Sequence, residues 1–104
     1  MTSPHAIERA LRPHADALRG LGIRSLVLFG SAARSEMEPG SDVDLLYEFL
    51  PEAATLDHIL GLQDLLEAAL GRSVDLVSRK HIGSILQRYI GDETVTVYER
   101  ASQG

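Results

Sequence analysis

Apolar residues recur along the chain with two periods that alternate from one segment to the next. A helical spacing of apolar positions predicts helices over residues 4–18, 55–70 and 81–90. Short apolar runs predict strands over residues 23–29, 42–49, 73–78 and 94–99. A brief helix is expected over residues 31–35. The expected fold class is therefore α/β (α+β), a small mixed β-sheet with flanking helices.

Capping residues mark the ends of two of these helices. Ser3 and Thr55 are expected N-caps, and Gly71 is the expected residue after the second long helix. Pro13 should divide the first helix, because it cannot donate a hydrogen bond to the carbonyl four residues earlier. In the 55–70 segment, the stripe expected to face the core consists of Leu56, Ile59, Leu60, Gln63, Leu66 and Leu70.

The connections between strands constrain the sheet only in part. A full helix joins the strands at 42–49 and 73–78, which favours a parallel crossover between them. The run at 23–29 lies between glycines and is expected to be buried on both faces of the sheet. Its direction relative to the strand at 42–49 is not determined by the pattern, because only a short helix and a loop connect them.

The composition excludes several classes of protein. The 104 residues are 44% hydrophobic and 24% charged, which is typical of one globular domain, here spanning residues 1–104. The formal net charge of −5 argues against a broad basic surface, so direct nucleic-acid binding is not expected. The chain has no cysteine for thiolate metal sites, and its four histidines lack ligand-like spacing. Without a signal-like or membrane-spanning apolar run, a cytoplasmic location and no membrane contact are expected.

Two carboxylates interrupt the apolar run at 42–49. Asp42 and Asp44 are two residues apart on a strand, so their side chains leave on one face and repel unless a cation lies between them. Mg²⁺ prefers such oxygen ligands together with substrate phosphates. A solvent-facing edge strand can carry the same Asp-x-Asp pair. Asp75 interrupts the run at 73–78, and if the two strands pair, three carboxylates and two metal ions would suit displacement at phosphorus.

A glycine–serine pair follows the first strand. Gly30 permits a sharp turn and a close approach of phosphate to the backbone, and Ser31 offers a hydroxyl and free amides. The same pair is typical of a plain strand exit with a helix N-cap. Arg34, one helical turn later, is either a phosphate ligand or a surface residue. The basic group Arg79, Lys80 and Arg88 either contacts a nucleotide, a polyanion or a partner, or forms an ordinary solvated surface.

The combined spacing resembles a known superfamily. Gly30-Ser31, ten further residues and then Asp42-Val43-Asp44 reproduce the GS-x10-D-x-D signature of the DNA polymerase β-like nucleotidyltransferases. The stretches "LFGSAAR", "SDVDLL" and "VDLV" resemble the minimal nucleotidyltransferases (MNT) of bacteria and archaea, and the last of them places Asp75 at a third acidic position. The resemblance covers nearly the whole chain. One departure is Ser35, where the family commonly has glycine.

The resemblance implies a fold, a site and a reaction. It implies a single minimal nucleotidyltransferase domain with an Mg²⁺ site, two ions being expected, held by the catalytic residues Asp42, Asp44 and Asp75. The implied nucleotide- and phosphate-binding residues are Gly30, Ser31, Arg34 and Ser41. The implied reaction transfers a nucleoside monophosphate, AMP from ATP in the expected case, to a hydroxyl of a partner protein.

The resemblance also implies a partner. Members this short usually pair with a HEPN-domain toxin and act as its antitoxin, so a hetero-oligomer is expected. Two alternatives stay open: an antitoxin with weak or absent catalysis that neutralises the toxin by stoichiometric binding, and a nucleotide-binding regulator without turnover. The apolar faces at 56–70 and 82–90 would supply either a partner surface or ordinary core.

Overall fold

The computed structural model describes residues 3–30, 42–78 and 94–100 of the chain. In chain order the elements are α1 (Pro4–Leu11), a 3-10 turn (Arg12–His14), α2 (Ala15–Gly20), β1 (Ile23–Leu28), β2 (Val43–Phe49), α3 (Leu56–Leu70), β3 (Val74–Ser78) and β4 (Val95–Glu99). Each predicted element within these residues is confirmed, with boundaries that shift by one or two residues. The helices predicted at 31–35 and 81–90 lie outside the described residues.

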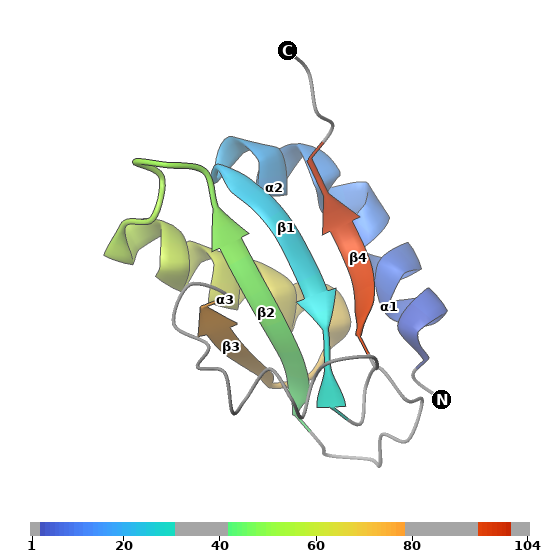
Figure 1. The fold of residues 1–104 in the computed structure, drawn as a ribbon. Helices are drawn as coiled ribbons and strands as arrows, with labels where there is room; N and C mark the ends of the chain where they lie inside the picture. Colours follow the sequence, from blue (N-terminus) through green and yellow to red (C-terminus); the bar gives the residue numbers. More distant parts are fainter. Residues whose placement is uncertain (1–2, 31–41, 79–93, 101–104) are drawn as a thin grey trace.

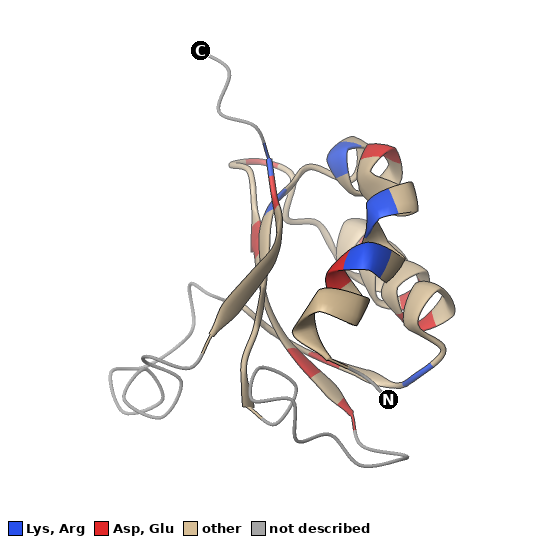
Figure 2. Cartoon of the chain, turned by 90° about the vertical axis from the view of Figure 1, so that its right-hand side faces the viewer, with Lys and Arg blue, Asp and Glu red and all other residues tan. Residues whose placement is uncertain are grey.

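The strands form one mixed sheet in the order β3-β2-β1-β4 (Figure 1). β1 pairs antiparallel with both β2 and β4, whereas β2 and β3 are parallel. The parallel crossover through α3 is therefore confirmed, and the direction that the sequence pattern left undetermined is antiparallel. Seen along the sheet, α1, α2 and α3 all cover the same face (Figure 2). The α+β class expected from the sequence, a mixed sheet with flanking helices, is confirmed.

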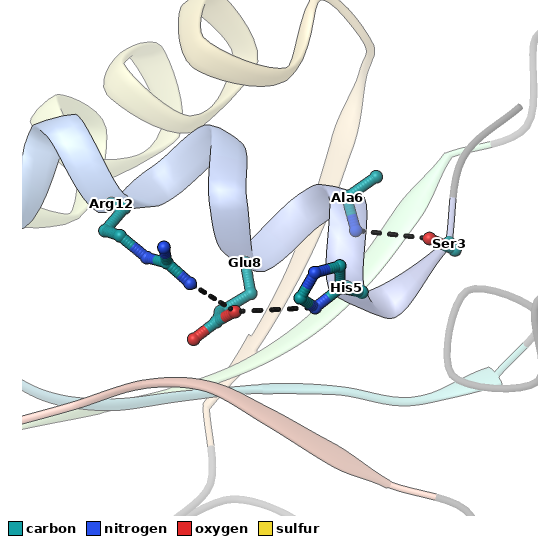
Figure 3. A network of polar contacts seen from close by, with 5 residues as sticks. All are labelled: Ser3, His5, Ala6, Glu8 and Arg12. Carbon is teal, nitrogen blue, oxygen red and sulfur yellow. Dashed lines mark hydrogen bonds and ion pairs between the residues drawn. The ribbon is translucent and has the colours of Figure 1, made fainter.

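The first helical segment begins and bends where its sequence predicts. Ser3 caps α1, since its Oγ accepts a hydrogen bond of 3.1 Å from the amide of Ala6. Such a cap typically stabilises a helix by about 1 kcal/mol. On the first turns Glu8 binds Arg12 at 3.1 Å and lies 3.9 Å from His5 (Figure 3). Pro13 lies in the 3-10 turn that separates α1 from α2, because its nitrogen cannot donate the helical hydrogen bond.

The main core fills the space between the sheet and its helices. The strands contribute their inward side chains and the helices one apolar face each, which removes a contiguous apolar surface from water. Its buried members are Ile7, Leu11, Leu18, Ile23, Leu26, Leu28, Val43, Leu45, Phe49, Leu62, Leu66, Val74 and Val97. Val43 and Leu45 flank Asp44 in this set, so the side chain of Asp44 leaves on the opposite face.

The apolar stripe of α3 is rotated from its predicted position. Leu62 and Leu66 are fully buried, whereas Leu56 and Leu60 are 70% and 55% exposed. The prediction that Leu56 and Leu60 face the core is therefore wrong. Leucines occupy a wide arc of this helix, so periodicity alone does not fix which part of the arc packs on the sheet. Thr55 and Gly71 end the helix as predicted, since Thr55 Oγ1 accepts from the amide of His58 and Gly71 has a φ of 66°.

The face of the sheet away from the helices carries a second, smaller apolar cluster. Val27 and Leu46 are buried there, with Phe29 and Val77 packed against them. The prediction that the first strand is buried on both faces is thereby confirmed. Because side chains alternate along a strand, Leu46 shares its face with Asp44, and Val77 shares its face with Asp75. Among the described residues, no helix is long and apolar enough to cross a membrane.

Candidate active site

The parallel pairing of β2 and β3 brings two of the predicted acids together. Asp44 and Asp75 are direct partners in the register of the two strands. Parallel neighbours lie about 4.8 Å apart, and paired residues project to the same face. The parallel direction follows from the crossover through α3, whose two ends join the neighbouring strands. The sequence predicts a shared site only if the two strands that carry these acids are neighbours. In the structure they are neighbours.

The backbone that follows β1 lies against Asp44. The amide of Phe29 donates to the carbonyl of Asp44 at 3.1 Å, which ties the strand exit to β2. Gly30 follows with a φ of 70°, a left-handed conformation that L side chains rarely adopt. A Cβ added at Gly30 would lie 2.7 Å from Oδ2 of Asp44. The turn therefore requires glycine for its conformation and also for the close approach of the backbone to Asp44.

The negative charges of Asp42 and Asp75 act on Asp44. The pKa of Asp44 is raised above its ordinary value, first because partial burial disfavours the charged form, and then because of the negative charges of Asp75 and Asp42. Asp44 is half-buried, whereas Asp42 and Asp75 are exposed. A cation near Asp44 would relieve both causes, since it replaces lost hydration and offsets the neighbouring charges. The site thus has the electrostatics of a cation-binding site.

The donor set fits a hard divalent cation. Carboxylate oxygens on rigid strands are ligands that Mg²⁺ accepts, and both Asp44 and Asp75 stand on such strands. Within the described residues, no three acidic or histidine side chains are grouped closely enough to hold a metal ion as they stand. Mutual repulsion favours separation of the exposed Asp42 and Asp75 where no positive charge lies between them. The metal-ligand roles of the three aspartates stay a prediction.

A protein-family comparison adds to this geometry. Residues 16–103 match the family model described as polymerase beta, nucleotidyltransferase. The chain belongs to this nucleotidyltransferase family. The match spans every strand of the sheet together with Gly30 and all three aspartates. The superfamily and the enzyme class inferred from the signature are confirmed.

Individual nucleotidyltransferases of known sequence or structure are similar along most of the chain. The protein adenylyltransferase MntA of Thermococcus cleftensis is 37% identical over 98 residues, which cover 93% of this chain and 98% of that protein. The solved structure of a proposed minimal nucleotidyltransferase is 32% identical, with a TM-score of 0.68 over 85% of this chain and 93% of its own. The recognition of the chain as a minimal nucleotidyltransferase is confirmed.

A third comparison concerns the fold alone. A chain from the complex of the tri-AMPylated Shewanella oneidensis HEPN toxin with MNT antitoxin matches with a TM-score of 0.60. The match covers 90% of this chain and 73% of that chain, at 18% sequence identity. At this identity the similarity supports the arrangement of sheet and helices, and it does not extend to individual side chains.

Several predicted residues of this nucleotidyltransferase lie outside the described part of the chain. These are the phosphate-binding candidates Ser31, Arg34 and Ser41 and the basic group Arg79, Lys80 and Arg88. Their roles stay predictions. Of the phosphate-binding candidates, Gly30 is the one that the structure describes, and it lies against Asp44.

Two residues of α3 that the sequence analysis did not assign to the site contact the strand of Asp75. Gln63 donates to the carbonyl of Val74 at 2.6 Å, and Glu67 accepts from the amide of Val74 at 3.0 Å. The signal for them was the placement of a glutamine within an otherwise apolar stripe, with an acid four residues later. Polar residues on a half-buried helix face usually have hydrogen-bond partners.

Two hollows of the described surface lie away from the aspartates. One of about 250 Å³ and one of about 180 Å³ are found between the first helices and β4, and both are lined by Ala15, Tyr98 and Glu99. β4 and β3 are the opposite edges of the sheet. These hollows are therefore separated from Asp75 by the width of the sheet, and the nucleotidyltransferase site does not include them.

Proposed function

We propose that this nucleotidyltransferase transfers AMP from ATP to a hydroxyl of a partner protein, and that the partner is a HEPN-type toxin for which the chain is the antitoxin. The observation that carries the proposal is the pairing of Asp44 with Asp75 beside the Gly30 turn. The adenylyltransferase of Thermococcus cleftensis supports the choice of AMP and of a protein acceptor. The AMPylated HEPN toxin of the Shewanella complex supports the choice of partner.

The proposed reaction is an in-line displacement at the α-phosphorus of ATP. The acceptor oxygen forms a bond to the α-phosphorus while the bond to the bridging oxygen of the β-phosphate breaks, and pyrophosphate leaves with that electron pair. The acceptor loses its proton, for which the Asp75 carboxylate is the proposed base. Asp75 is suited to this role because it is exposed and therefore accessible to an acceptor that arrives from a partner.

Asp42, Asp44 and Asp75 would hold Mg²⁺, and two ions are proposed. When bound, the metal neutralises charge on the phosphates and on the attacking oxygen. Gly30 is proposed to bind phosphate through its backbone, because a glycine permits a close approach of phosphate to the main chain. Ser31, Arg34 and Ser41 are the proposed further phosphate ligands. The proposed location is the cytoplasm, where ATP and Mg²⁺ are available.

The proposal is tested by label transfer. The purified chain is mixed with Mg²⁺, ATP labelled at the α-phosphate and the protein encoded beside it in its genome. We expect label on the partner with the unmodified chain and none with Asp44→Asn. Absence of transfer with each of the four nucleoside triphosphates would contradict the proposal. Protection of toxin-bearing cells by the double variant Asp42→Asn/Asp44→Asn would instead support neutralisation by stoichiometric binding.

A further inference from the structure

The outer edge of β3 is bonded to side chains of α3. β3 is the edge strand next to β2, and the amide of Val43 donates to the carbonyl of Ser73 at 2.9 Å. In a parallel ladder, backbone groups of successive residues point alternately toward and away from the neighbouring strand. Because the carbonyl of Ser73 points toward β2, the N–H and C=O of Val74 point away from it, to a side on which the described residues form no further strand.

Gln63 and Glu67 supply the partners that a further strand would supply. The side-chain amide of Gln63 donates to the carbonyl of Val74 at 2.6 Å, and the amide of Val74 donates to Oε2 of Glu67 at 3.0 Å. Gln63 also donates to the same Oε2 at 2.8 Å, which holds the two side chains together. Both polar groups of Val74 are thus bonded by residues one helical turn apart.

The position of this contact matters because Val74 directly precedes Asp75. Val74 has a buried side chain in the main core, and its backbone is held by β2 through the neighbouring residues on one side and by α3 on the other. The backbone from which the Asp75 side chain projects is therefore fixed from both directions. Residues that orient a metal ligand without contacting the metal are important for the site. Their removal commonly lowers metal affinity or activity by about 10- to 100-fold.

We propose that Gln63 and Glu67 are positioning residues that set the place of the Asp75 carboxylate relative to Asp44. The inference rests on the proposed function, since it assigns the pair a role in metal binding and turnover at that site. Neither side chain contacts the substrate or the metal in this assignment. Their effect passes through the backbone of Val74 to the neighbouring acid.

Four variants test the inference in the full chain. Glu67→Ala removes the acceptor for the Val74 amide, and Gln63→Met removes the donor to its carbonyl while keeping the length of the side chain. Glu67→Gln keeps an oxygen acceptor and should restore the properties of the unmodified chain. Asp64→Ala is the matched control, because it removes an exposed acid from the same helix. Thermal unfolding identifies any variant that fails to fold.

Three measurements separate positioning from a purely structural role. Mn²⁺ binding, followed by electron paramagnetic resonance, should weaken by about tenfold or more in Glu67→Ala and Gln63→Met. Hydrogen exchange at the amide of Val74 should accelerate in Glu67→Ala. In label transfer, kcat should fall by about 10- to 100-fold while the KM for ATP changes less than about twofold. Glu67→Gln and Asp64→Ala should resemble the unmodified chain in all three measurements.

The outcomes distinguish the inference from the proposed function. If the unmodified chain transfers label but Glu67→Ala and Gln63→Met bind Mn²⁺ as tightly as Asp64→Ala does, the inference is overturned and the function stands. If the folded, unmodified chain neither binds Mn²⁺ nor transfers label, both are overturned. Loss of Mn²⁺ affinity in Glu67→Ala, with recovery in Glu67→Gln, supports the inference even where transfer to a given partner fails.

Discussion

Asp44 and Asp75 stand side by side in the parallel pair of β2 and β3, although 31 positions separate them in the sequence. The pairing places two like charges about one strand spacing apart on a partly buried surface. Their proximity is part of the reason that the pKa of Asp44 is raised. Such an arrangement disfavours the fold unless the charges are neutralised, which makes Asp44 sensitive to cations and to pH.

Asp44→Asn should abolish transfer and at the same time stabilise the fold at neutral pH. The loss of transfer should exceed the 10- to 100-fold effects typical of residues that only support a metal ligand. The pKa of Asp44 is higher in the folded state than in the unfolded state. Between these two pKa values, the folded state therefore binds more protons than the unfolded state. The contribution of Asp44 to the free energy of unfolding should therefore fall as the pH rises above about 3.9.

Urea unfolding between pH 3 and pH 7, in the presence of a chelator, checks this prediction. The gain in stability of Asp44→Asn over the unmodified chain should grow with pH across that interval. Saturating Mg²⁺ should raise the melting temperature of the unmodified chain and leave that of Asp44→Asn nearly unchanged, since ligand binding stabilises only the state that binds. A stability difference that shrinks with rising pH would contradict the assigned electrostatics.

Gly30→Ala should impair both stability and transfer. A left-handed backbone costs an L residue roughly 1–2 kcal/mol, and the added Cβ would lie 2.7 Å from Oδ2 of Asp44. Gly20→Ala is the control without either constraint, because the φ of Gly20 is not positive and a Cβ there meets nothing within 4 Å. That control should be neutral or more stable by roughly 0.5–1 kcal/mol. Chemical denaturation and label transfer measure both effects, and equal behaviour of the two variants would refute the steric account.

Leu62→Ala and Leu60→Ala should differ sharply although both lie on α3. Leu62 is fully buried, so its truncation should lower the free energy of unfolding by about 2–5 kcal/mol. Leu60 is 55% exposed, and its truncation should change that free energy by about 0.5 kcal/mol or less. Guanidinium unfolding of the isolated chain compares them. A larger loss in Leu60→Ala would show that the helix packs through the stripe that its sequence predicts.

The contribution of Glu67 to the free energy of unfolding should change with pH in the opposite direction to that of Asp44. Its pKa is lowered by the hydrogen bond from the Val74 amide and then by that from Gln63. A lowered folded-state pKa contributes stability above the unfolded pKa, and this contribution is lost as the pH falls through the folded pKa. Thermal unfolding at pH 7 and pH 3 should therefore show a smaller loss on acidification in Glu67→Gln than in the unmodified chain. An equal loss of stability in the two proteins would show that the charged carboxylate of Glu67 does not accept these hydrogen bonds.

Local signals in the sequence were sufficient for the helices and strands of the described residues. Ser3, Thr55 and Gly71 end helices by bonds or conformations that depend on their own chemistry, so they can be identified without knowledge of the fold. The parallel crossover was also predictable, because a full helix between two strands leaves few other connections. These features made it possible to predict that Asp75 would share a site with Asp44 if the two strands pair, and the structure shows that they do.

Features that depend on packing were not predictable in the same way. The antiparallel direction of β1 and the exposure of Leu56 and Leu60 follow from how the layers fit together, and periodicity does not encode that fit. The bonds from Gln63 and Glu67 to Val74 depend on the register between a helix and an edge strand. Side chains that support the site through the backbone could therefore be identified only from the structure.

The turn at Gly30 has a consequence for the range of sequences that can support this fold and site. Every replacement of glycine adds a Cβ, so no amino acid at position 30 avoids the approach to Asp44. Position 20 has no such restriction. In a saturation library selected for transfer, position 30 should retain a single residue, whereas position 20 should accept many. The tolerance of a glycine to mutation is here decided by its backbone conformation together with one neighbouring oxygen atom.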